Sequence, residues 1–192
     1  MKTVVRASVI VMVMTLTGLG LSSCITINES TDRSSKYMDP NSHHGSSHSM
    51  VITDKKSFAG AMVPHHQQAI DISEFASSNT ANAGILAIAE KIIAEQSPEI
   101  DKMNKWLEGQ SVDYSMMMDG MLSGAQVAEL KDSRDSEFDQ IYVQYMVEHH
   151  EGAIAMAADA LGLDDPELSA FANSIIENQT AEIEELMALL NN

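Results

Sequence analysis

The chain has 192 residues, with 28 acidic side chains against 11 Lys and Arg, a formal net charge of −17 and a single cysteine, Cys24. This negative charge would repel a phosphate backbone, so we expect no nucleic-acid partner. One cysteine allows neither an internal disulfide nor a zinc site built from several thiolates.

The N-terminus predicts a secretory signal. Lys2 and Arg6 precede an apolar run over about 7–20, which is too short for a membrane span. The motif LSSC, ending at Cys24, resembles the lipobox of bacterial lipoproteins, in which the cysteine is lipidated after cleavage. We therefore predict a signal peptide at 1–23, a lipid on Cys24 as the only membrane contact, and a place in the cell envelope outside the cytoplasm. The alternative is an ordinary cleaved signal in which Cys24 is incidental.

Cleavage before the cysteine would leave 169 residues with nine basic and 28 acidic side chains, a net charge of −19. Residues 24–53 are polar, with few large apolar side chains, and predict a disordered tether that cannot bury a core. This tether is either a hydrophilic spacer or an accessory metal-binding tail. The tail ligands would be His43, His44, His48 and Met50.

Residues 54–192 have a helical pattern without strand signals. Asp54 is a plausible N-cap, Ser123 and Gln126 form a capping box, and Asp165 with Pro166 gives an N-cap and first helical residue. The predicted helices span about 54–78, 83–107, a short segment after 123, 135–161 and 166–190.

The two halves of this region repeat each other, over about 54–108 and 135–190. The pattern Met-x-x-His-His-x-x-Ala-Ile occurs twice at an offset of 84 residues, and an Ile, Gln, Glu, Ile pattern occurs twice at an offset of 83. Duplicated helical hairpins predict an all-α fold, a ferritin-like four-helix bundle. The matched positions are Met62, His65, His66, Ala69 and Ile70 with Met146, His149, His150, Ala153 and Ile154, and Ile92, Gln96, Glu99 and Ile100 with Ile175, Gln179, Glu182 and Ile183.

Helical periodicity places one histidine of each pair on an apolar seam that faces the bundle interior, and the other on a flank beside it. The partner helices bring a Gln and a Glu to their own inward seams. Imidazole and thioether ligands together favour copper, as Cu(I) or Cu(II), above other metals. The predicted metal ligands are His65, His66, His149, His150, Met62 and Met146, and further ligands or ligand partners are Gln96, Glu99, Gln179, Glu182 and Met156.

A metal-free interior is the alternative. Each Glu could hold an imidazole proton, and the carbonyl of each Gln could complete a satisfied hydrogen-bond network. Met62 and Met146 would then be ordinary core residues. Pro64 is expected to kink the first helix beside the site, because it leaves the carbonyl of Gly60 without its helical donor.

The two Met-x-x-His-His-x-x-Ala-Ile strings are accompanied by Ile92-Ile93 through Gln96, Trp106-Leu107 and Gly120-Met121-Leu122-Ser123. Together these motifs resemble domain-of-unknown-function family 305, over about Asp54 to Leu190. The resemblance implies a ferritin-like fold, a secreted or periplasmic location and copper binding outside the cytoplasm, in resistance or delivery. One departure is that Ile72 stands where the second repeat has Met156.

The leading hypothesis is a lipid-anchored metal-binding protein that is not an enzyme. A metal-free scaffold and a di-iron oxidase are the alternatives, but no Glu is followed by His three residues later, as the oxidase site requires. Nothing resembles a nucleophile elbow or a Gly-rich phosphate loop. A second copy of the chain or a metal-transport protein is left open as a partner.

Overall fold

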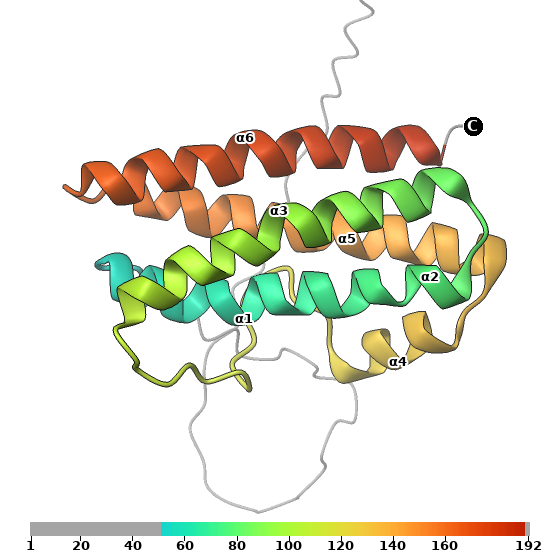
Figure 1. Ribbon diagram of the computed structural model, residues 1–192, viewed down its shortest axis with the longest axis horizontal. Helices are drawn as coiled ribbons and strands as arrows, with labels where there is room; N and C mark the ends of the chain where they lie inside the picture. The colour runs from blue at the N-terminus through green and yellow to red at the C-terminus, as the bar shows by residue number, and fades with distance from the viewer. Residues whose placement is uncertain (1–50, 191–192) are drawn as a thin grey trace, which may run out of the picture. The chain divides into compact units, whose positions relative to one another are not determined.

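The computed structural model describes residues 51–190. Within this part every regular element is a helix, and α1, α3, α5 and α6 form a four-helix bundle (Figure 1). The predictions for residues 1–50, including the signal, the lipidated Cys24, the tether and the tail histidines, lie outside the described residues. The helices are α1 (Lys55–Glu74), α2 (Ala76–Asn79), α3 (Ala83–Leu107), α4 (Gly124–Asp132), α5 (Asp135–Ala160) and α6 (Pro166–Leu189).

The bundle consists of two antiparallel hairpins, α1 with α3 and α5 with α6. The hairpins pack through α1 against α5 and through α3 against α6, so each duplicated half provides two neighbouring helices. The fold predicted from the repeat is therefore confirmed. No helix among residues 51–190 combines the length and apolar character that a membrane crossing requires.

The predicted helix starts are confirmed by their caps. Asp54 accepts a hydrogen bond from the backbone N–H of Ser57, and Ser123 forms a capping box with Gln126. Asp165 accepts from the backbone N–H groups of the next helix, which begins at Pro166. These caps satisfy donors that would otherwise be unpaired at each N-terminus.

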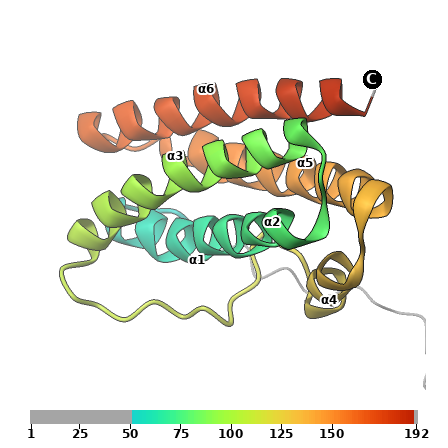
Figure 2. The same ribbon diagram turned by 45° about the vertical axis from the view of Figure 1, so that its right-hand side comes forward.

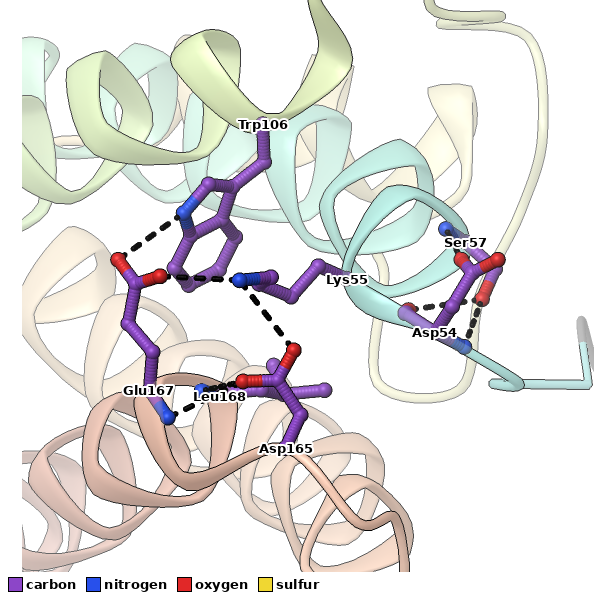
Figure 3. Close-up of polar contacts among 7 residues, drawn as sticks. All are labelled: Asp54, Lys55, Ser57, Trp106, Asp165, Glu167 and Leu168. Atoms are coloured by element: carbon purple, nitrogen blue, oxygen red, sulfur yellow. Dashed lines mark hydrogen bonds and ion pairs between the residues drawn. The ribbon is translucent and has the colours of Figure 1, made fainter.

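Lys55 connects the two hairpins at one end of the bundle. Its ammonium lies 3.2 Å from the Asp165 carboxylate and 2.9 Å from that of Glu167, whose other oxygen accepts from the indole N–H of Trp106 at 3.3 Å (Figure 3). Both carboxylates belong to the start of α6, whereas Lys55 begins α1. Because these groups are partly exposed to solvent, each ion pair contributes little to stability, and the contact mainly marks where the two hairpins meet.

The first helix ends earlier than predicted, at Glu74 instead of about Ser78. A separate helical turn, α2, follows Phe75. The Asn79 side chain on this turn donates to the carbonyls of Leu130, Lys131 and Ser133, so it ties α2 to the end of α4. Such a long-range anchor has no signature in the local helical pattern.

Pro64 lies inside α1 without ending the helix, and Pro98 does the same in α3. The apolar core forms two clusters, one including Ile72, Phe138 and Met146, the other including Phe58, Met62 and Phe171. In sequence His65 falls between Met62 of one cluster and Ala69 of the other. The histidines thus occupy a polar layer between two apolar halves.

Candidate metal centre

Four histidines lie in the interior of the bundle. His65 and His66 come from α1, and His149 and His150 come from α5, at exposed fractions of at most 1%. The helical register predicts that all four are at least half buried, and the structure buries them completely. Burial of an imidazole without a partner is costly, so its nitrogen atoms need an explanation.

His65 and His149 meet across the two hairpins. Their ring centroids are 3.8 Å apart, and the rings are tilted by 44°. These are the histidines that the heptad-like stepping places on the inward seams. The equivalent positions of the two repeats therefore face one another at the centre of the molecule.

His66 and His150 face the carboxylates of their own hairpins. His66 Nε2 donates to Glu99 at 2.8 Å, and His150 Nε2 donates to Glu182 at 2.8 Å. Each carboxylate comes from the partner helix of the same hairpin, α3 or α6. The predicted role of each Glu in holding an imidazole proton agrees with this geometry.

The Nδ1 atom of every one of these histidines is buried and has no hydrogen-bond partner. In His66 and His150 the hydrogen bond donated to the carboxylate places a proton on Nε2, so Nδ1 is the nitrogen left for another partner. His65 has the same arrangement, because its Nε2 donates to the backbone carbonyl of Asp119 at 3.2 Å. This is the tautomer that a metal-binding imidazole adopts when an oxygen holds its other nitrogen.

The metal-free alternative, in which glutamine carbonyls complete a satisfied network, does not agree with the hydrogen bonds of the structure. Gln96 and Gln179 are buried, at 2% exposure each, and neither their amide nitrogen nor their amide oxygen has a partner. His149 also lacks a partner at both ring nitrogens. The polar layer is thus only half satisfied by its own side chains.

Burial holds the central histidines neutral. It lowers the pKa of His65 to about 3, helped by the neighbouring His66 and opposed by the hydrogen bond to Asp119. Burial likewise lowers the pKa of His149 well below its ordinary value, and a charge on His65 would lower it further. Neutral imidazole is the form that binds metal ions, so protons compete weakly for this site.

The loop between α3 and α4 closes the site on the side of α1 and α5. A Cβ on Gly152 of α5 would collide with the carbonyl oxygen of Asp119. A Cβ on Gly120 would stand 2.7 Å from the carbonyl oxygen of Glu148 and 3.0 Å from that of His149. Only glycines permit this approach of loop and helix, and the contact of Asp119 and Gly120 with α5 has no local signal in the sequence.

The remaining predicted ligands lie in or beside the polar layer. Met62 and Met146 are fully buried one turn before their histidine pairs, and Met156 is half-buried. Among residues 51–190, no three His, Cys, Asp or Glu side chains are arranged to hold one ion. The four predicted histidine ligands are therefore not gathered around one position among these residues.

Monovalent copper and silver accept fewer ligands, and they favour imidazole nitrogen and thioether sulfur. The unpaired Nδ1 atoms of His65 and His149, with Met62 and Met146 nearby in the sequence, fit such an ion. His66 and His150 could join them or remain with their carboxylates. The donor set therefore suits a soft monovalent cation better than a hard divalent one.

Comparison with known proteins identifies relatives of this bundle. The family model described as Domain of unknown function (DUF305) matches residues 55–190, whereas no curated protein matches. A DUF305 protein from Streptomyces coelicolor, described as secreted, is 25% identical with a TM-score of 0.66, over 72% of this chain and 93% of its own. A DUF305 fragment from Deinococcus radiodurans is 26% identical with a TM-score of 0.67, over 71% and 95% of the two chains.

CopM in its Cu(I)-bound form is 28% identical to this chain with a TM-score of 0.63, over 73% of this chain and 98% of its own. CopM has also been solved in Cu(II)-bound, silver-bound and apo forms. The match to the family model spans the whole bundle, including both histidine pairs. The chain belongs to the DUF305 family.

Proposed function

We propose that this protein binds copper outside the cytoplasm, as a buffer or carrier and not as an enzyme. The observation that carries the proposal is the set of buried, unpaired Nδ1 atoms on His65, His66, His149 and His150. Each unpaired buried polar group costs about 1–3 kcal/mol, and a bound cation would remove that cost for several groups together. The copper-bound and silver-bound states of CopM support the same metal class.

Cu(I) is the oxidation state that the site favours. The interior is shielded from water, burial keeps His65 and His149 neutral, and Met62 and Met146 are buried one helical turn before the histidine pairs. Soft thioether ligands select Cu(I) over harder divalent ions. Glu99 and Glu182 would act by orienting His66 and His150, since each carboxylate already holds an Nε2 proton.

The location rests on the sequence and on the relatives. The N-terminal signal, the LSSC motif and the description of the Streptomyces coelicolor protein as secreted all favour a site outside the cytoplasm. We propose that a lipid on Cys24 anchors the chain to the membrane. The tail histidines would collect ions weakly and raise their concentration near the bundle.

A metal-free scaffold is the second candidate, and the two histidine–glutamate pairs favour it. Such pairs can fix helix register without any ligand. The glutamines and His149 count against it, because a register device gains nothing from atoms that have no partner. Metal content separates the two candidates.

The test is metal retention by the full chain, purified without a histidine tag. We expect bound copper after reconstitution and dialysis, and successful competition with a chromogenic Cu(I) chelator. A variant with His65, His66, His149 and His150 replaced by Ala should lose this binding, with circular dichroism as the check on folding.

The matched control keeps the bundle and changes the tail. His43→Ala, His44→Ala, His48→Ala and Met50→Leu together should leave the tight Cu(I) equivalent in place. If the tail variant loses copper and the variant without the four buried histidines keeps it, the bundle is not the site.

A further inference from the structure

Methionines are concentrated in the loop that covers the histidines. Residues 116, 117, 118 and 121 are all Met, within the segment that joins α3 to α4. Figure 2 shows this segment running from the end of α3 along the α1 side of the bundle to α4. The copper site proposed above does not use any of these four thioethers.

The loop is fixed to both helices that carry the histidines. On α1, the Gln68 side chain accepts from the Leu122 N–H at 2.7 Å and donates to the Leu122 carbonyl at 3.0 Å. Gly120 packs directly on Gly152 of α5, as described above. The carbonyl of Asp119 accepts the Nε2 proton of His65. The loop backbone is therefore in direct contact with the buried site.

The exposure of the four methionines follows a gradient. Met117 is exposed, at 46%, Met116 and Met121 are half-buried, and Met118 is buried, at 7%. Met118 covers the core as any apolar residue would. An exposed Met117 has no such role, yet it places a soft sulfur at the surface, two residues before the Asp119 carbonyl that contacts His65.

The chemistry of these side chains favours one class of ligand. Thioether sulfur is a weak acceptor for protons and a good ligand for soft monovalent metal ions. The backbone N–H of Met118 lies 3.4 Å from the sulfur of Met121, so that sulfur is turned toward the loop itself. An ion held by Met121 would lie two residues along the chain from Asp119, whose carbonyl contacts His65.

We propose that Met116, Met117 and Met121 form a second site, which captures a soft monovalent ion, Cu(I) or Ag(I), and passes it by ligand exchange to His65 and His149. The inference rests on the proposed function, because the histidine pair receives the ion. The loop site holds the ion more weakly than the buried histidines do, so that transfer runs inward. No oxidant or reductant takes part, since the ion keeps its charge.

The test follows Ag(I) binding to the full chain, with methionine methyl groups labelled with carbon-13 and histidine rings labelled with nitrogen-15. Single Met→Leu variants assign the methyl signals. We expect the methyl signals of Met116, Met117 and Met121 to shift on addition of Ag(I). In the variant M116L/M117L/M121L, loading of the histidines should slow by at least about tenfold, whereas their final affinity should stay close to that of the wild type.

Leucine approximates the volume of methionine, so this triple variant should fold. If the triple variant does not fold, the loading rate is measured instead in the single variant M117L, which changes only an exposed side chain. M187L is the matched control, because it removes another exposed thioether, on α6, outside the loop sequence.

Three outcomes would overturn the inference. Methyl signals of the loop that do not move, or equal loading rates in the wild type and the triple variant, would refute the loop site while leaving the histidine site standing. Histidine signals that do not move in the wild type would refute the histidine site, and the transfer step with it.

Discussion

At the scale of single residues, one repeated sequence pattern gives two different roles. The first histidine of each pair lies on the seam and meets its counterpart, His65 against His149, at a centroid distance of 3.8 Å. The second, His66 or His150, points to a carboxylate of its own hairpin. A rotation of about 100° between adjacent helical residues accounts for this division. Adjacent histidines are therefore not equivalent ligands.

The carboxylates give the first prediction. Glu182→Gln should lower Cu(I) affinity by about 10–100-fold, because groups that orient a metal-binding imidazole typically contribute that much. The buried carboxylate of Glu182, at 1% exposure, fixes Nε2 of His150. Glu185→Gln is the control, since Glu185 is exposed and pairs with Lys91. Chelator competition measures both variants, and equal affinities would show that the carboxylate does not support the site.

The depressed pKa values predict how stability of the metal-free protein depends on pH. His65 takes up its proton at about pH 3 in the folded state, but at about 6.5 when unfolded. The unfolded chain thus binds more protons in this window, so stability is full above about pH 6.5 and is lost as the pH falls toward 3. The loss should be on the order of 1 kcal/mol per pH unit for each such histidine.

Urea unfolding at pH 7, 6 and 5 measures this loss. Replacing both His65 and His149 by Asn should reduce the slope of the unfolding free energy against pH, by an amount equivalent to the uptake of up to about two protons on unfolding. A wild type and a double variant with parallel pH profiles would contradict neutral histidines in the interior.

At the scale of elements, the sequence predicts the helices well and the connections poorly. The caps at Asp54, Ser123 and Asp165 and the doubled motif place the helix starts and the two hairpins, because these signals are local or repeat exactly in register. The split at Phe75 and the contact of the loop with Gly152 depend on residues far apart in the chain. Local periodicity contains no information about such contacts.

The loop contact gives the prediction at this scale. Gly152→Ala should destabilise the protein by about 1–3 kcal/mol, because the new methyl group would force the Asp119 carbonyl away from α5. The same displacement should weaken the hydrogen bond to His65 and lower Cu(I) affinity. Chemical unfolding and chelator competition test the two effects together.

Gly60→Ala is the matched control, since a Cβ there meets no atom within 4 Å. Within a helix, that change should stabilise the protein by about 0.5–1 kcal/mol. If both variants change stability equally, the close approach at Gly152 has no energetic role.

At the scale of the whole molecule, the candidate site is the place where the two repeats join. The central contact of His65 with His149 connects one hairpin to the other. The ion pairs of Lys55 do the same at one end of the bundle (Figure 3). Sequence periodicity and the duplication predict that the histidines of both hairpins face one interior, whereas the contact of His65 with His149 is seen only in the structure. Which nitrogen is left free follows only from the oxygens around each ring, including the carbonyl of Asp119 on the loop.

An ion held between the hairpins should stabilise the bundle. At a free ion concentration of about 100 times the dissociation constant, the free energy of unfolding should rise by about 2.7 kcal/mol. Thermal unfolding with and without Ag(I) measures this in the variant that lacks the tail ligands. The same increase in a variant with His65 and His149 replaced by Ala would place the ion elsewhere.

The most direct test is the protonation and metal state of each histidine nitrogen. Nitrogen-15 spectra of the histidine rings should be recorded for the tail variant before and after one equivalent of Cu(I) under reducing conditions. Nδ1 of His65 and His149 should shift strongly on metal binding, while Nε2 of His65, His66 and His150 should keep its proton. Ring signals that remain unchanged, or a metal bound through Nε2 of His65, would contradict copper binding at the buried histidines as described.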